Sequence, residues 1–498
     1  MKRILPASFY NPLTLAGSVI ALFNLALIVF LLVVELLAKR PRPYSDLVIL
    51  LVLPLFILIG VAFIILGIVR QRRRHKAAPP GEPRFLVVDF NDDKQRRLVI
   101  LLSAGFICLT LLYTFGVFRG YEFVESDFFC TRVCHTVHRL DSQAHVFSSH
   151  AKVACSACHV GSGTQYFILT KLKGITDLYS LLSNTFPRPI PAPIKDLRPS
   201  KDICQDCHGP KYAIREDLQV RKYYLSDTKN TEWEIDLLLK MGAVRVQIDK
   251  PPVMHWHYAV ARQIEYASAD PKREAIPWVR AVGFDGKARI YRAEDGNAAG
   301  KEPAPEQKHV MDCIDCHNRV GHELYPPDRV TNALLSLKSI DPSLPDIKST
   351  AVEALEGKYD SREAARSGIK DAIMEFYKKK HPDIAASREA ELKQVILMLQ
   401  DLYDRNYDPV MKETWKSYPS QSGHMYSLGC FRCHDGKHKS DDGTVLTKDC
   451  SLCHLLIKKR MEKEKKKAVL SEETNPHPVD VGDSYKEMNC SDCHGGGN

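Results

Sequence analysis

One short pattern recurs along this chain: two cysteines separated by two residues, with a histidine directly after the second cysteine. Two thiols on one helical turn can form thioether bonds to both vinyl groups of one haem, and the histidine that follows can bind the iron. The earliest unit has one extra residue between its cysteines. The units are Cys130/Cys134/His135, Cys155/Cys158/His159, Cys204/Cys207/His208, Cys313/Cys316/His317, Cys430/Cys433/His434, Cys450/Cys453/His454 and Cys490/Cys493/His494.

Cysteine pairs at this spacing also occur in zinc ribbons, iron–sulfur sites and thioredoxin-like redox pairs. None of these sites requires a histidine after every pair, and histidine is only 19 of the 498 residues. The units use all of the 15 cysteines except Cys108, which lies in an apolar stretch. We therefore predict seven covalently attached haem c groups, with the paired cysteines as attachment sites and the seven following histidines as proximal iron ligands.

Seven haems in residues 118–498 leave little protein for each cofactor, so the porphyrins would supply much of the buried apolar mass. We expect a mainly α fold, with helices and loops around the haems and little sheet. We also expect this part not to fold without haem. The predicted regions are a membrane anchor (1–117), a tetrahaem domain (118–329) with an insert (211–310), a helical spacer (330–415) and a C-terminal trihaem module (416–498).

Three apolar segments precede the first unit, at residues 13–37, 47–69 and 98–117. Each is about 20 residues or longer, which is enough for a helix to cross a hydrocarbon core of roughly 30 Å. A cleaved signal peptide is the alternative for the first segment, but it is long and lacks a small-x-small cleavage site. The sequence therefore predicts three transmembrane helices in a lipid bilayer.

The loops between these segments predict their orientation. Loop 70–97 holds nine Lys and Arg residues and loop 38–46 holds three, so the positive-inside rule places loop 70–97 in the cytoplasm. Everything after residue 117 would then lie in the periplasm of a bacterial inner membrane. The three segments contain no histidine, so no haem chain would cross the membrane within this subunit. The net charge of +9 is modest, and we expect no nucleic-acid partner.

Four passages between residues 130 and 326 resemble the NapC/NirT/NrfH family of membrane-anchored tetrahaem quinol dehydrogenases. The first is His150, five residues before Cys155, and the second is the unit at Cys155 followed by Lys171, Asp177 and Tyr179 on an expected helix. The third is the unit at Cys204. The fourth is the run from Cys313 through His322 to Pro326.

The resemblance implies a quinol site at the haem on His135, with Asp177 at its distal face and Lys171 beside it. It also implies His150 as distal ligand of the haem on His208, and His322 as distal ligand of the haem on His159. The chain departs from the family in having three predicted spans in place of one. The general architecture is similar to that of heptahaem inner-membrane cytochromes of extracellular metal respiration, the ImcH type.

The residues themselves give a separate argument for Asp177 and Lys171. Quinol oxidation releases protons as well as electrons, and a carboxylate tuned by burial and a neighbouring cation can accept a proton. The alternative is a solvated helix, predicted over 166–186, that carries ordinary charges.

Eleven histidines lie outside the units and loop 70–97, a supply that suits haems with two histidine ligands each. In the insert, His255 and His257 alternate and would face the same way on a strand, so one of them is a predicted ligand. His309 is the rival for the haem on His317. The other candidates are His138 and His145 near the first unit, and His424, His438 and His477 near the last three.

We expect electrons to pass from the membrane quinol pool, as menaquinol or ubiquinol, to periplasmic c-type cytochromes. An anchored relay that is reduced by a partner subunit remains the second hypothesis. A terminal reductase is the third, but it needs an open iron position, and the supply of histidines argues against one. The run Lys458–Lys467 is expected to be a solvated helix, with a docking patch for an acidic cytochrome as the alternative.

The haem count gives a first test. Intact-mass measurement of the purified protein should show seven covalently attached haems. Replacing Cys490 and Cys493 together by alanine should remove the mass of one haem, whereas Cys108→Ala should remove none. Seven haems still attached in the double variant would contradict the prediction.

Overall fold

The structure is a computed structural model that describes most of the chain. The described residues form two compact units. The N-terminal unit comprises residues up to Cys134 together with Cys155–Tyr179, and the C-terminal unit comprises His135–Ala154 and the chain from Ser180 onward. The described residues are 11–37, 49, 53–77, 91–134, 137, 139–160, 164–192, 199–205, 207–208, 217–241, 254–255, 257, 264–282, 286–294, 302–461, 477 and 479–494.

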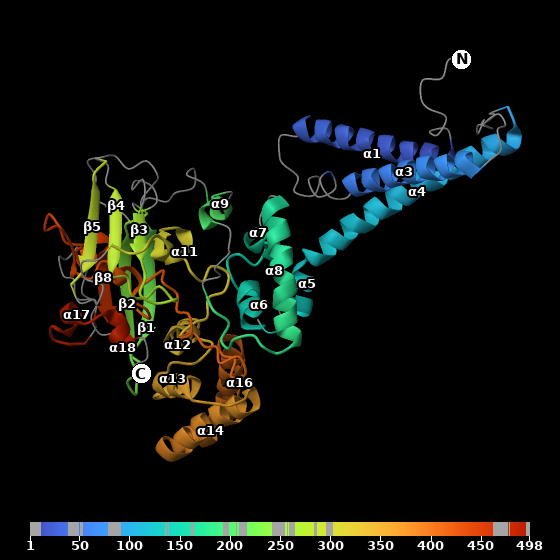
Figure 1. Ribbon diagram of the computed structural model, residues 1–498. Coiled ribbons are helices and arrows are strands. Elements are labelled where there is room, and N and C mark those ends of the chain that lie inside the picture. Colours follow the sequence, from blue (N-terminus) through green and yellow to red (C-terminus); the bar gives the residue numbers. More distant parts are fainter. Residues whose placement is uncertain are drawn as a thin grey trace. The chain divides into compact units, whose positions relative to one another are not determined.

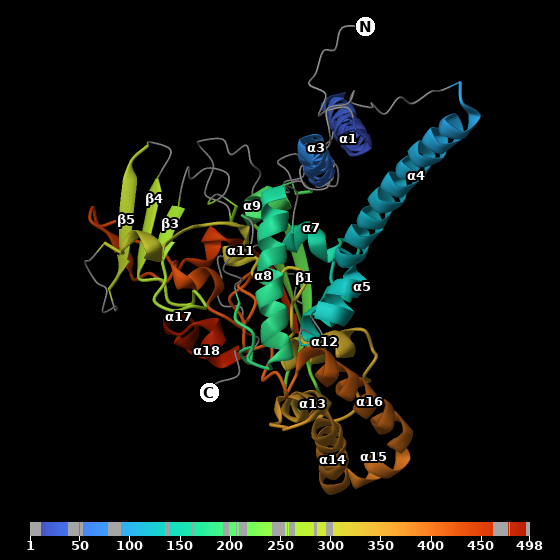
Figure 2. The ribbon, with the colours of Figure 1, turned by 45° about the vertical axis from the view of Figure 1, so that its right-hand side comes forward.

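Two apolar helices of the N-terminal unit, α1 (Pro12–Leu37) and α3 (Leu53–Ala77), pack along each other (Figures 1 and 2). Gly17 and Gly60 lie where the two backbones meet, and a Cβ on either glycine would collide with the backbone of the other helix. Small residues at such crossings let membrane helices approach closely. The close packing of α1 against α3 therefore requires glycine, which has no side chain, at both positions.

The stretches Leu13–Leu31 and Leu53–Arg73 are long and apolar enough to cross a membrane. They agree with the first two predicted spans. The third predicted span, 98–117, lies within helix α4 (Asp93–Val124). Its passage through a membrane stays a prediction.

The chain then leads directly into the first attachment segments. Helix α5 (Asp127–Phe129) is capped by Ser126, and a single π-helical turn, η3 (Cys130–Cys134), follows it. The Asp127 carboxylate accepts a hydrogen bond of 2.9 Å from the backbone N–H of Cys155, at the start of α7 (Cys155–His159). Helix α8 (Thr164–Leu182) confirms the helix predicted over 166–186.

The insert builds most of a five-stranded antiparallel sheet in the C-terminal unit. Its central strands are β3 (Ile264–Ala267), β4 (Trp278–Val282) and β5 (Ala288–Ala293), which lie side by side in Figure 1. Its edges are β6 (Lys308–Val310), beside β3, and β7 (His438–Ser440), beside β5. Each edge strand thus lies next to an attachment segment in the sequence: Cys313 follows β6, and His434 precedes β7.

A second, three-stranded antiparallel sheet also joins the insert to the C-terminal part. Strands β1 (Asp217–Tyr224) and β2 (Glu232–Leu239) form a hairpin, and β8 (His454–Met461) pairs with β2. Strand β8 begins at His454, the histidine of the sixth attachment unit. Both sheets therefore use insert strands to hold segments that carry attachment cysteines.

The prediction of a mainly helical chain is confirmed, but the sheets are more extensive than we expected. The basic run at Lys458 is one place where we predicted a helix and the structure has a strand, because its residues up to Met461 belong to β8. Lys458 pairs with Asp236 and Arg460 with Glu234 across the two strands, and opposite charges stabilise such pairs. The rest of the run lies outside the described residues.

The helices of the spacer build an apolar core from the chain's own side chains. They are α12 (Pro327–Ser336), α13 (Ile347–Glu356), α14 (Arg362–Lys380), α15 (Pro382–Ser387) and α16 (Glu389–Asn406), and most of them are labelled in Figures 1 and 2. Leu355, Ile369 and Leu399 are among the side chains buried between them. The expectation that haem would supply much of the buried apolar mass therefore does not hold for this part of the chain.

The remaining helical elements are short, and most of them carry or adjoin attachment cysteines. They are α6 (Arg139–Val146), α9 (Ser200–Cys204), η5 (Pro305–Gln307), α11 (Cys313–Cys316), η6 (Gly429–Arg432), η7 (Cys450–Leu452), α17 (Ser484–Glu487) and α18 (Cys490–His494).

Two leucines of α16 test this protein-built core. Leu399 is fully buried, whereas Leu397 on the same helix is 56% exposed. Leu399→Ala should lower the free energy of unfolding by about 2–5 kcal/mol, because it leaves a cavity in a packed core. Leu397→Ala should change it by less than about 0.5 kcal/mol. Urea unfolding of the purified protein, followed by circular dichroism, measures both, and equal effects would contradict the packing.

Candidate haem sites

The attachment cysteines lie on single helical turns, which place the two thiols of a pair close together. The backbone N–H of His317 donates to the Cys313 carbonyl at 2.8 Å, and that of His434 donates to the Cys430 carbonyl at 3.0 Å. The Asp312 side chain caps the first of these turns.

Two predicted attachment cysteines, Cys207 and Cys493, differ from the burial that we expected around the haems. A sulfur bonded to a buried porphyrin should be shielded from water, as at Cys433, where burial raises the pKa of the thiol to about 12. Cys207 and Cys493 are instead exposed, whereas Cys158 is partly buried, as most of the other paired cysteines are. The attachment roles of all the paired cysteines rest on their spacing in the sequence and stay predictions.

The clearest geometric feature is a set of histidine pairs in which the two rings face each other. Ring centres in these pairs are 5.8–6.4 Å apart. Two metal–nitrogen bonds of about 2 Å, and about 1 Å from each nitrogen to its ring centre, give roughly 6 Å across one iron. The pairs are His145–His322, His150–His208, His255–His317, His257–His434, His424–His454 and His477–His494.

Five of these pairs join an attachment histidine to a histidine from elsewhere in the chain. His150 faces His208, the partner that the family resemblance implied for it. His424 faces His454 at 6.1 Å, and one buried ring nitrogen of His424, Nδ1, has no hydrogen-bond partner among the described residues. The spacing and this unsatisfied nitrogen both fit a haem iron held between two imidazoles.

Burial keeps several of these rings neutral. Loss of solvent, together with the ring of its facing partner, lowers the pKa of His424 to about 4, and the same causes lower that of His434 to about 4. Burial also lowers the pKa of His257 and of His317. A neutral imidazole is the form that binds a metal, so the protein environment favours ligation at these positions.

The insert supplies two facing histidines where we expected one. His255 faces His317 at 6.4 Å, and His257 faces His434 at 5.8 Å. The alternating spacing of the two residues was the signal in the sequence. His309, the rival for His317, lies on β6 with its ring 5.5 Å from that of Tyr266, so its prediction as the ligand does not fit this geometry.

His438 does not fit the prediction of an iron ligand. Its Nδ1 lies 2.9 Å from the Asp435 carboxylate and its Nε2 lies 2.7 Å from the Ile276 carbonyl, so both ring nitrogens are engaged. Burial opposes the charged ring, but these hydrogen bonds outweigh it and raise the pKa of His438. His438 instead holds β7 to the insert from a position that is 1% exposed.

The sixth pair contains no attachment histidine. His322 faces His145 on α6, whereas the resemblance implied His159, which belongs to the other unit. The Nδ1 of His322 lies 3.0 Å from the Asp141 carbonyl, and a hydrogen bond of this kind orients a ring for metal binding through its other nitrogen. His145 was itself a candidate near the first unit.

Asp177 and Lys171 lie in the N-terminal unit, whereas His135 is assigned to the C-terminal unit. Asp177 is exposed on α8, whereas the argument from the sequence called for a partly buried carboxylate. His135 and His138 lie outside the described residues, and so do the side chains of Cys134 and Lys171.

Comparisons with known proteins agree with this arrangement. The family model described as the NapC/NirT cytochrome c family, N-terminal region, matches residues 92–189, and one described as cytochrome c3 matches residues 424–497. The chain is 35% identical over 486 residues to cytochrome c-type protein ImcH of Geobacter sulfurreducens, a match that covers 97% of this chain and 95% of that protein. No solved structure gives a significant match.

The chain belongs to the NapC/NirT cytochrome c family. It is an ImcH-like, membrane-anchored multihaem c-type cytochrome of electron transport. The resemblance that we drew from the residues between 130 and 326 is thereby confirmed. The cytochrome c3 match covers the part of the chain where we predicted the last three haems.

Two histidines near the C-terminal units test the ligand assignment. His424→Ala should convert one haem from low spin to high spin, because its iron loses an axial ligand. His438→Ala should leave every spin state unchanged and lower stability by about 1–3 kcal/mol, because it leaves buried hydrogen-bond partners unsatisfied. Electron paramagnetic resonance of the oxidised protein separates the two results. A high-spin haem in the His438 variant would contradict the assignment.

Proposed function

We propose that this cytochrome oxidises quinol at the outer face of a bacterial inner membrane and passes the electrons through seven haems to periplasmic c-type cytochromes. One observation carries the proposal. A single compact unit contains the two candidate membrane helices, the cysteines of the first attachment unit, the attachment unit at Cys155, and Asp177, whereas His135 belongs to the other unit. Asp177 and Lys171, which the family resemblance implies for quinol, therefore belong to the same compact unit as the candidate membrane helices.

The surface of α8 supports the same proposal. Leu169, Leu172, Ile175 and Tyr179 are each more than half exposed, and their spacing places them on one face of the helix. Asp177 lies on the opposite face by the same periodicity. A helix with one apolar and one polar face suits the boundary between lipid and water, which is where a quinol head group resides.

The chemistry assigned to Asp177 is proton transfer. A quinol gives up two electrons and two protons when it becomes a quinone, and haem supplies one-electron carriers for the electrons. Asp177 would accept a proton from the quinol hydroxyl and release it on the outer side. Lys171, six residues earlier on α8, would lie beside the haem on His135.

The roles proposed for the cysteines and histidines complete this picture. The paired cysteines, Cys158 and Cys207 among them, would carry the haems, and the seven histidines that follow the pairs would be the proximal ligands. By the family resemblance, His322 would be the distal ligand of the haem on His159. The distal ligands would include His150, His255, His257, His424 and His477.

Reduction by a quinol analogue tests the proposal. Purified protein should be reduced by a menaquinol or ubiquinol analogue, and Asp177→Asn should slow that reduction by about 100-fold or more, as for the loss of a general base. Asp383→Asn, at an exposed aspartate of α15, should leave the rate unchanged. If the unaltered protein is reduced only when a partner subunit is added, the chain is an anchored relay and the proposal fails.

A further inference from the structure

Arg432 connects two attachment segments that are more than a hundred residues apart in the sequence. It stands between Cys430 and Cys433, and its guanidinium donates one hydrogen bond to the carbonyl oxygen of Asp315. A second hydrogen bond, of 2.9 Å, goes to the Arg273 carbonyl. A residue between the two cysteines of one attachment unit is thus hydrogen-bonded to a residue between the two cysteines of another.

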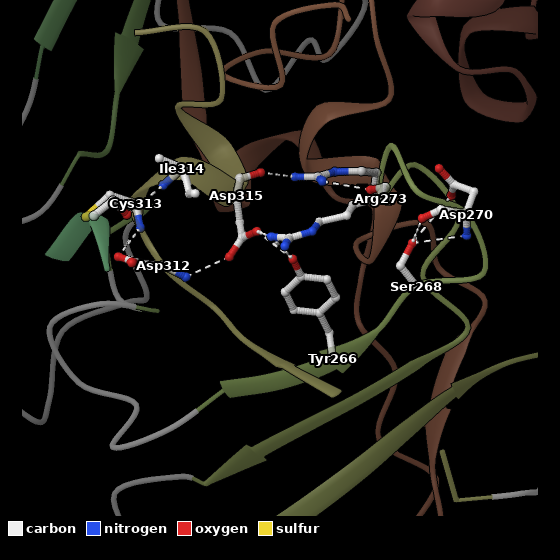
Figure 3. Close-up of polar contacts among 10 residues, drawn as sticks. Tyr266, Ser268, Asp270, Arg273, Asp312, Cys313, Ile314 and Asp315 are labelled. Carbon is white, nitrogen blue, oxygen red and sulfur yellow. Dashed lines mark hydrogen bonds and ion pairs between the residues drawn. The ribbon is translucent and has the colours of Figure 1, made fainter. Parts of the chain in front are cut away.

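Asp315, whose carbonyl accepts the hydrogen bond from Arg432, is itself held in place through its carboxylate. It stands between Cys313 and Cys316, and its side chain is only 3% exposed. Figure 3 shows its carboxylate pointing toward Tyr266 of β3 and toward Arg273, which donate to one carboxylate oxygen at 2.5 and 2.8 Å. The other oxygen accepts the backbone N–H of Asp312 at 2.7 Å. A buried carboxylate with this many donors holds its segment firmly to the sheet.

The insert supplies the histidines that face the attachment histidines of these two units. The backbone N–H of Met254 donates to the Lys240 carbonyl at 2.8 Å, and that of His255 donates to the Met241 carbonyl at 3.0 Å. These bonds anchor the run that ends at His257 to the end of β2. His255 then faces His317 and His257 faces His434, so histidines only two residues apart serve two separate sites.

We propose that these contacts build one junction of two haems, on His317 and His434, which joins the predicted tetrahaem domain (118–329) to the region that matches cytochrome c3 (424–497). Arg432 and Asp315 are its positioning residues, and His255 and His257 are its distal ligands. The attachment segments are tied together on one side, and the distal ligands share one short run of chain on the other. The two haems are therefore held as a unit.

The junction sets where electrons cross between the two regions. Haem irons held by His317 and His434 would supply one-electron transfer from the first site to the second, with no proton transferred. This direction of flow rests on the proposed quinol oxidation, but the existence of the junction does not.

The charge of Arg432 provides a test that is independent of quinol. In haem-loaded full-length protein titrated with dithionite and redox mediators, Arg432→Gln should lower two midpoint potentials together, because a nearby positive charge favours the ferrous state of both haems. Arg432→Lys keeps the charge and should give a smaller shift. Arg388→Gln, which removes an arginine paired with Asp341 and Glu391 in the spacer, should shift none. A shift of a single potential, or no shift at all, would overturn the proposal.

The shared distal run provides the second measurement. His255→Ala and His257→Ala should each produce one high-spin haem, and the double variant should produce two. His309→Ala should produce none. All four readings come from electron paramagnetic resonance of the oxidised protein and need no turnover. One high-spin haem in the double variant would mean that both histidines serve the same iron, and the junction would be disproved.

Discussion

The architecture depends on one requirement of c-type haem: the iron needs a ligand on each face, and only the ligand next to the cysteines is fixed by the local sequence. The ligand on the other face must come from elsewhere in the chain. In this structure the facing rings stand about 6 Å apart, the span of one iron between two imidazoles. Each pair therefore ties two distant segments together, and the fold must bring those segments into position.

The insert brings several of these distant segments into position. Its strands form the middle of one sheet and most of another, and the C-terminal strands β7 and β8 pair with them. His438 strengthens this arrangement as a buried polar link to Ile276 and not as a ligand. A chain with many cofactors still needs protein elements that hold the cofactors in order, and here the insert provides these elements. The spacer adds an apolar core of its own.

Features that depend on local sequence could be predicted, and features that depend on distant contacts could not. The cysteine spacing revealed the attachment units, and hydropathy revealed the apolar helices. The choice between His255 and His309 was open because both precede Cys313. Only the pairing of β6 with β3 turns His309 toward Tyr266. The basic run at Lys458 looked helical because its acidic partners on β2 lie more than two hundred residues earlier. Arg432 and Asp315 gave no signal, since any residue can stand between the two cysteines of a unit.

A density map of the haem-loaded protein that resolves the axial ligands tests the facing histidine pairs most directly. We expect one iron between His255 and His317, one between His257 and His434, and one in each of the pairs His150–His208, His424–His454 and His477–His494. An iron bound by His309 or His438, or an attachment histidine with a different partner, would contradict this expectation.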